Sequence, residues 1–304
     1  MELGMTVFSQ TVTLLVLMVV GIICYKAKII NETGSKQLTS LVMYVVNPLV
    51  IIMSYQTKLS DHLAHGMITA FICSGISFAV AIAVSYIFIK KSNKYDFTVE
   101  RLSVVYSNCG FVGIPLISGI FGAEGVLYLT AYLTFYNVLI WSHGIVSIRG
   151  NYGGGSFKKI ITNPSILAVI VGFLFMLFEI KIPFIPGNAF ELIVNVNSPL
   201  AMIVAGATIA TTSIKSAFKN LRIYYVSALR LVAVPLLTLL CTVPFFGSDV
   251  SVLTVAILAG CPVGAMITLF AVKFDKDSKY TSEIFAFTTL ISCASLPLLV
   301  SFLP

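Results

Sequence analysis

An asparagine followed by closely spaced glycines and a proline stands within an apolar segment of this chain. Asn108 precedes Gly110, Gly113 and Pro115. Proline removes a backbone donor and clashes with the carbonyl one turn earlier, and glycine costs about 1 kcal/mol in a helix interior. We therefore expect an interrupted helix here. The N-terminus of a half-helix offers free N–H groups and a positive dipole end, and an asparagine amide adds a donor, so this segment is suited to bind a carboxylate.

A second segment of the same kind contains Gly260, Pro262 and Gly264. Unpaired backbone groups in hydrocarbon cost several kcal/mol each, so such breaks survive only where protein or a watery cavity satisfies them. We predict that the two interruptions meet near the membrane midplane and form the binding site. A pair of purely structural kinks is the alternative.

Other polar residues lie well inside apolar segments, where each is costly unless it is paired. Asn47 directly precedes a further predicted helix break at Pro48, and a related break is expected at Pro199; Asn137 lies in another apolar segment. A hydrogen bond between helices is the alternative role for these asparagines. The residues predicted to contact the anion are Asn108, Gly110, Phe111, Val112, Asn47, Asn137, Pro262, Val263 and Gly264.

Arg230 is the one cation deep inside an apolar segment. It either draws anions inward or holds carbonyls freed by a helix break, and the sequence does not decide between these roles. No acidic residue lies near the centre of an apolar segment, which argues against a standard proton relay or a cation site. No cysteine spacing suggests a metal, and no catalytic constellation is present, so we expect neither an enzyme nor a cofactor.

The composition is that of a polytopic membrane protein. Hydrophobic residues make up 58% of the 304 residues and charged residues only 10%, whereas soluble domains carry about 25% charged residues. The net charge of +7 does not point to nucleic acid, because the basic residues lie in short loops between apolar segments. The expected surroundings are the lipid bilayer of the cell membrane.

Ten segments are long and apolar enough to be membrane spans. They cover residues 6–24, 37–55, 66–89, 102–120, 125–147, 164–180, 188–211, 221–244, 250–272 and 281–303. Sixteen lysines and arginines fall in the loops of one face and two in those of the other. This bias places the first face in the cytoplasm and both termini outside the cytoplasm.

The two halves of the chain look like copies of one unit. One constant offset places Val20-Gly21 on Val171-Gly172, Pro48-Leu49 on Pro199-Leu200, and Val112-Gly113 on Val263-Gly264. Five spans per copy is an odd number, so the second copy is expected to be inverted. The predicted fold is all-α, with ten transmembrane helices in two inverted repeats, 1–148 and 161–304, joined by a short cytoplasmic linker, 149–160. Inverted repeats with interrupted helices are typical of transporters.

The segment Asn108-Cys-Gly-Phe-Val-Gly-Ile-Pro-Leu resembles a motif of the auxin efflux carrier family, which includes plant auxin carriers and bacterial malate and malonate carriers. Asn163-Pro164, Ser198–Gly206 and Arg230-Leu-x-x-x-Pro235 also resemble that family. The resemblance implies a fold similar to bile-acid symporters and sodium/proton antiporters. Spans 1, 2, 6 and 7 would form a scaffold, spans 3–5 and 8–10 a moving transport domain, and spans 4 and 9 a crossover that holds the substrate carboxylate.

The resemblance also implies a homodimer and a contact between Asn108 and the substrate, with Asn137 nearby. One departure is Ile267, where the plant pattern has a second proline. The predicted function is secondary transport of a small mono- or dicarboxylate by an elevator-like, alternating-access motion. The alternatives are a sodium- or proton-coupled symporter of the same fold, a channel, and a transporter-derived ligand sensor.

Overall fold

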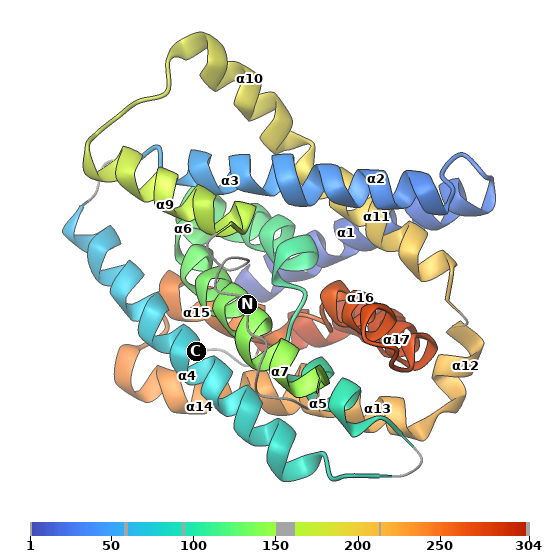
Figure 1. The fold of residues 1–304 in the computed structure, drawn as a ribbon. Helices are drawn as coiled ribbons and strands as arrows, with labels where there is room; N and C mark the ends of the chain where they lie inside the picture. The colour runs from blue at the N-terminus through green and yellow to red at the C-terminus, as the bar shows by residue number, and fades with distance from the viewer. Residues whose placement is uncertain (1, 58–59, 93–94, 150–161, 213, 302–304) are drawn as a thin grey trace.

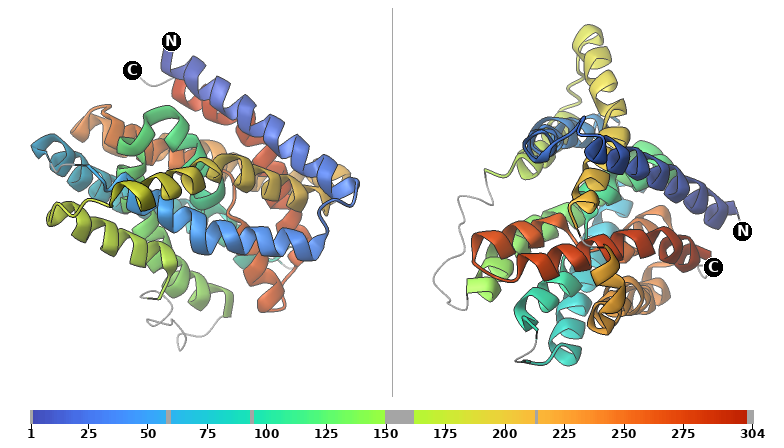
Figure 2. Two further views of the ribbon diagram at one scale, coloured as in Figure 1. Left: turned by 90° about the horizontal axis from the view of Figure 1, so that it is seen from above. Right: turned by 90° about the vertical axis from the view of Figure 1, so that its right-hand side faces the viewer.

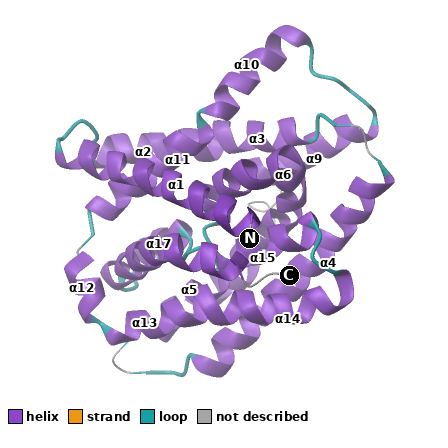
Figure 3. Ribbon diagram, turned by 180° about the vertical axis from the view of Figure 1, so that it is seen from behind, coloured by secondary structure: helices purple, strands orange, loops and turns teal. Residues whose placement is uncertain are grey.

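The computed structural model describes residues 2–57, 60–92, 95–149, 162–212 and 214–301, and these fold into an assembly of helices (Figures 1 and 3). The predicted linker 149–160 lies outside the described residues except for Arg149. The helices of the first half are α1 (Glu2–Lys26), α2 (Glu32–Leu41), η1 (Val42–Val46), α3 (Asn47–Ser54), α4 (Asp61–Phe88), α5 (Phe97–Val105), η2 (Cys109–Gly113), α6 (Ile114–Leu139), η3 (Ile140–Gly144) and α7 (Ile145–Arg149).

The second half of the chain is helical in the same way. Its helices are α9 (Pro164–Leu177), α10 (Phe184–Asn195), α11 (Asn197–Ala210), α12 (Ile214–Lys219), α13 (Leu221–Ala228), η4 (Leu229–Ala233), α14 (Val234–Phe246), α15 (Val250–Gly260), α16 (Ala265–Lys273) and α17 (Ser278–Ser301). The elements labelled η are single π-helical turns, which widen the helix locally.

Within the described residues, seven continuous helical stretches are long and apolar enough to cross a membrane. The stretch Cys109–Arg149 is 41 residues long, and it bends at Gly122, whose φ of 60° interrupts the helix between the fourth and fifth predicted spans. Two further apolar helices, α9 and α15, are shorter. The chain is therefore an all-helical, multi-pass membrane protein, as predicted. Its division into two inverted repeats of five spans stays a prediction.

Side-chain caps fix where several helices begin. The Asn163 side chain accepts from the amide of Ser165 at 2.9 Å, and Pro164 occupies the first helical position of α9. Asp96 caps α5 by accepting from the Thr98 amide at 3.0 Å. These caps satisfy amides that have no partner inside the helix.

Three prolines inside the apolar segments are each preceded by a π-helical turn. Pro48, Pro115 and Pro235 follow η1, η2 and η4. A widened turn accommodates the missing donor and the bulk of the proline ring. The chain consequently stays helical through Pro48, so the predicted break there is a widened turn. Near Pro199 the interruption falls at Val196, between α10 and α11.

The helices form two layers, which Figure 2 shows edge-on in its right-hand view. One layer holds α1 to α3 and α9 to α11, and the other holds α4 to α6 and α13 to α17. Within the first layer the halves pack reciprocally: Gly21 of α1 lies against the backbone of Ile203 in α11, and Gly172 of α9 lies against the Tyr55 ring at the end of α3. Gly21 and Gly172 are equivalent in the sequence repeat, so the pairing is what two related halves would produce.

Candidate functional site at the helix crossing

The two interrupted segments lie side by side and are joined through their backbones. The backbone N–H of Asn108 donates to the Pro262 carbonyl at 2.7 Å, and the backbone N–H of Gly264 donates to the Tyr106 carbonyl at 2.9 Å. Ser107 and Val263 face each other between these bonds as an antiparallel pair. The crossing is therefore one connected unit that contains the ends of four helices, α5, η2–α6, α15 and α16.

Residue types at the crossing follow from this geometry. Pro262 has no N–H to return to Asn108, so the Asn108 carbonyl instead accepts from the amides of Val112 and Gly113, at 3.1 and 3.0 Å. A Cβ on Gly264 would lie 3.1 Å from the Ser107 carbonyl oxygen, so a side chain there would press the two segments slightly apart. Pro115 and Gly260 lie in the flanking helices α6 and α15. The predicted break residues are thus divided between the extended segments and the helix ends beside them.

Arg230 holds this crossing together from inside the protein. Its side chain is fully buried and donates to five backbone carbonyls, those of Val104, Val105, Leu258, Ala259 and Cys261, at 2.6 to 3.5 Å. These carbonyls belong to the C-terminal ends of α5 and α15. Of the two roles that the sequence left open, the geometry supports the role of holding freed carbonyls.

A cavity of about 470 Å³ lies between the two layers, beside the crossing. Asn47 from the first layer and Asn108 and Asn137 from the second line it together. The remaining wall comes from α2, η1, η2, η3, α6, α11, α16, α17 and the N-terminus of α9. The three asparagines predicted from the sequence therefore surround one space.

Two of these asparagines present unsatisfied polar atoms. Asn108 is 4% exposed and Asn47 5% exposed, yet Asn108 Nδ2 and Asn47 Oδ1 have no hydrogen-bond partner in the described part of the chain. Asn108 Oδ1 accepts from the Phe111 amide at 3.4 Å, so its Nδ2 remains available as a donor. In contrast, Asn137 Nδ2 already donates to the Leu133 carbonyl at 2.8 Å. Buried donors without partners are costly, which favours a ligand that accepts from Asn108.

Only some of the other residues predicted to contact the anion line the cavity. Gly110 and Phe111 line the cavity, whereas Val112, Pro262, Val263 and Gly264 do not. The Val263 amide is already used, because it donates to Thr288 Oγ1 at 3.2 Å. The part of the second segment that reaches the cavity is the first turn of α16, Ala265 and Met266.

Sequence reasoning did not identify Ala265, Met266, Tyr136 or Trp141 as lining residues. Ala265 and Met266 directly follow Gly264, so they could have been found by following the break to the helix that starts after it. Nothing in their types marks Tyr136 and Trp141, because aromatic residues are common throughout these apolar segments.

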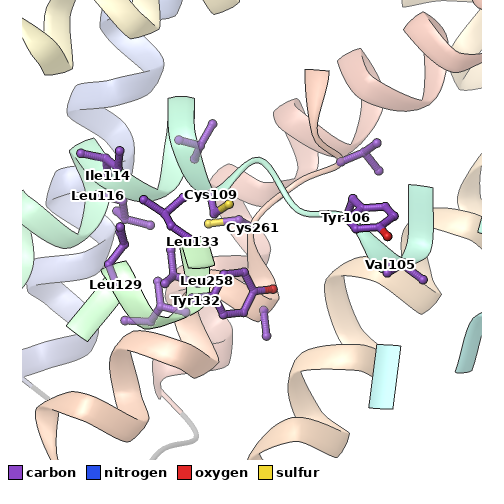
Figure 4. Packing of buried hydrophobic residues seen from close by; sticks show 14 of the residues in the cluster. Val105, Tyr106, Cys109, Ile114, Leu116, Leu129, Tyr132, Leu133, Leu258 and Cys261 are labelled. Atoms are coloured by element: carbon purple, nitrogen blue, oxygen red, sulfur yellow. The ribbon is translucent and has the colours of Figure 1, made fainter. Parts of the chain in front are cut away.

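The packing behind the cavity is tight and apolar. Cys109 and Cys261, one from each interrupted segment, lie close together with Leu133, Leu258 and Tyr132 around them (Figure 4). Both thiols are fully buried and free. Among the described residues no group of three or more His, Cys, Asp or Glu side chains could hold a metal ion. The asparagines and helix N-termini at the cavity offer hydrogen bonds and helix-dipole electrostatics.

An all-helical membrane fold with interrupted helices that meet beside a mostly apolar cavity containing a few asparagines is typical of membrane transport proteins. The model of the membrane transport protein family matches residues 6–156 and 153–300 of the chain. The chain belongs to this family, which confirms the resemblance to auxin efflux carriers.

Two archaeal relatives are similar over much of their length. An uncharacterized transporter of Methanothermobacter thermautotrophicus is 26% identical over 304 residues, covering 97% of this chain and 98% of the relative. An uncharacterized transporter of Methanocaldococcus jannaschii is 23% identical over 216 residues, covering 66% and 68%.

Proposed function

We propose that this chain is a secondary transporter that binds a small organic anion at the helix crossing and carries it by alternating access. The observation that carries the proposal is Asn108, which lines the cavity and whose buried Nδ2 donor has no hydrogen-bond partner among the described residues. A carboxylate oxygen is a strong acceptor for such a donor.

The electrostatics of the wall support an anion. Two helices begin at the cavity, η2–α6 after Asn108 and α16 after Gly264. The first amides of a helix lack intrahelical partners and lie at the positive end of its dipole. Among the described residues that line the cavity, none is charged. A carboxylate would therefore meet donors and positive dipole ends, with no negative side chain against it.

The position and size of the cavity support transport of a small molecule. Its volume of about 470 Å³ falls in the range of small-ligand pockets, which is roughly 300–1,000 Å³. Its wall is shared between the two helical layers, and the crossing belongs to only one of them. An elevator-like displacement of the layer that contains α4 to α6 and α13 to α17 would carry the bound anion past α1 to α3 and α9 to α11.

Counterflow of a radiolabelled carboxylate in proteoliposomes tests the proposal, after a thermal-shift screen of organic acids selects the substrate. Asn108→Ala should reduce exchange at least tenfold, because the loss of one hydrogen bond to a charged group is worth about 1.5–3 kcal/mol. Asn197→Ala is the matched control, since Asn197 is equally buried but does not line the cavity. Unchanged exchange by Asn108→Ala, or no carboxylate exchange by the wild type, would overturn the proposal.

The same vesicles separate the alternatives that the sequence left open. Strict dependence of flux on a sodium or proton gradient would favour a coupled symporter. Saturable binding without flux would favour a ligand sensor, and flux without saturation or counterflow would favour a channel. Uncoupled, saturable counterflow is the expected result, because no carboxylate among the described residues lines the cavity to hold a cation.

A further inference from the structure

The four helix ends at the crossing divide into two negative and two positive ends. A helix terminus carries roughly half an elementary charge, negative at the C-terminus and positive at the N-terminus. α5 ends at Val105 and α15 at Gly260, so their C-termini together amount to about one negative charge. Arg230 donates to carbonyls of both ends and carries one positive charge, which offsets this sum.

Within the described part of the chain, the charge of Arg230 is balanced by these helix ends and not by a carboxylate. Among the described residues no acid forms an ion pair with Arg230. Arg222 of the same layer is different, because it lies 2.7 Å from the buried acid Glu100 and is neutralised by that acid. The positive charge of Arg230 is therefore available to cancel the negative ends of the two half-helices.

The two positive ends open on the cavity, and none of the described residues that line it supplies a counter-charge. The helix formed by η2 and the first part of α6 begins beside Asn108, and α16 begins at Ala265; Cys109 and Ala265 line the cavity. Together these N-termini amount to about one positive charge. Asn108 points to a ligand independently of the helix ends, because it lines the same cavity, is 4% exposed, and holds an Nδ2 donor that has no partner in the described part of the chain.

We propose that the site selects a singly charged anion, a monocarboxylate, and that Arg230 sets this selectivity without touching the substrate. The proposal rests on the proposed function and narrows its substrate class. With the negative ends cancelled, the cavity carries the equivalent of one uncompensated positive charge. The second carboxylate of a dianion would meet only neutral side chains, and an ion in such surroundings is costly.

Arg230 acts across the thickness of one chain segment. Its Nε donates to the Cys261 carbonyl at 3.0 Å. Cys261 lies against Cys109 (Figure 4), and Cys109 also lines the cavity. The charge therefore lies behind the wall, in a water-poor interior where electrostatic effects reach further than in solvent. Arg230 is a positioning residue, since it fixes both half-helices and sets the potential at their ends.

The wild-type protein allows a direct test with two matched series of probes. Each series contains a monoanion, a neutral amide and a dianion of similar shape. The first series is benzoate, benzamide and isophthalate, and the second is hexanoate, hexanamide and adipate. Equilibrium binding to the purified protein should favour the monoanion over both others by at least tenfold in the series whose shape fits. Tighter binding of the dianion, or equal binding of the amide, would overturn the charge assignment and leave carboxylate transport standing. Failure of every anion to bind would overturn the proposed function as well.

Arg230 variants separate a field effect from a loss of structure. Arg230→Gln should reduce the monoanion-to-amide affinity ratio at least tenfold, whereas Arg230→Lys keeps the charge and should retain the ratio even if the protein melts at a lower temperature. Thr288→Val removes the hydrogen bond to the Val263 amide at the same crossing without changing charge, and should leave the ratio unchanged. Equal ratios in the wild type and Arg230→Gln would overturn the role of Arg230. If the variants do not fold, the wild-type series decides the charge assignment.

Discussion

The Tyr55 hydroxyl lies 2.7 Å from the Thr130 hydroxyl, in a fully buried contact between α6 and the end of α3. Thr130 Oγ1 donates to the Leu127 carbonyl at 2.6 Å, so Tyr55 is the donor of this pair. The two residues belong to different helical layers. Their bond therefore ties together the two layers whose relative movement the proposed transport requires.

Tyr55→Phe should accordingly change the rate of exchange. A net hydrogen bond is worth about 0.5–1.5 kcal/mol, so removing it should change the populations of the transport states by roughly two- to tenfold. The expected result is an altered exchange rate with the substrate affinity of the dominant state unchanged. Tyr224→Phe is the control, because the Tyr224 hydroxyl donates to the Phe218 carbonyl only six residues earlier in the chain and contacts none of the helices α1 to α3 or α9 to α11 through this bond. Identical rates in both variants would show that the contact does not restrain the movement.

The close approach of α1 and α11 should tolerate no side chain at Gly21. A Cβ there would overlap the backbone of Ile203, which cannot rotate away. Gly21→Val is expected to destabilise the protein by about 1–3 kcal/mol or more, through forced separation of the helices. Thermal unfolding in detergent measures this. Gly187→Ala is the control, since its nearest neighbour would lie at 3.9 Å, and equal melting temperatures for the two variants would contradict the packing.

Glu100 is a buried acid whose partners come from two other helices. It accepts from Arg222 Nε and Nη2 at 2.8 and 2.7 Å and from the Tyr280 hydroxyl at 2.9 Å. Glu100→Gln should destabilise the protein by about 1–3 kcal/mol, because it weakens the charged hydrogen bonds of a buried acid and leaves the partly buried Arg222 without an ionised partner. Chemical unfolding of this variant and of Glu100→Gln/Arg222→Met provides the measurement. The double variant should be the less destabilised of the two, and the reverse order would exclude a buried-charge penalty.

The N-terminus of α16 should respond to charge at Ala265. An aspartate there would place a negative charge at the cavity, beside the proposed carboxylate. Ala265→Asp is expected to weaken benzoate binding at least tenfold, since like-charge juxtaposition costs several kcal/mol. The isosteric Ala265→Asn should bind far better than Ala265→Asp. If both substitutions weaken binding equally, crowding and not charge is responsible, and the first turn of α16 does not face the anion.

Much of the fold could be predicted from the sequence because interrupted apolar segments leave a strong pattern. The broken segments around Asn108 and Pro262 and their pairing followed from glycine and proline spacing. The widened turn at Pro48 did not, because a proline predicts a disturbed helix without saying whether a π-turn absorbs it. The membrane location of the chain is confirmed, whereas the inverted repeats, the homodimer and the extracytoplasmic termini stay predictions.

The candidate site was predictable in part. Asn47, Asn108 and Asn137 could be selected because neutral polar residues are rare and costly in apolar spans. The partners of Arg230 could not, since five carbonyls from two distant segments give no sequence signal. The Glu100–Arg222 pair was also missed, because both residues stand at the ends of apolar segments, where charged side chains are expected to face water.

The central claim is that Asn108 and the helix ends beside it receive a carboxylate. A titration of benzoate and hexanoate into the wild type and Asn108→Asp tests it most directly. The aspartate can still cap the Phe111 amide, and the helix N-terminus favours its ionised form, so the fold should be kept while the donor becomes a negative charge. We predict a loss of affinity of about a hundredfold or more, with an unchanged melting temperature. Wild-type affinity in Asn108→Asp would contradict the account, because an anion that tolerates a negative charge at residue 108 cannot be bound at this crossing.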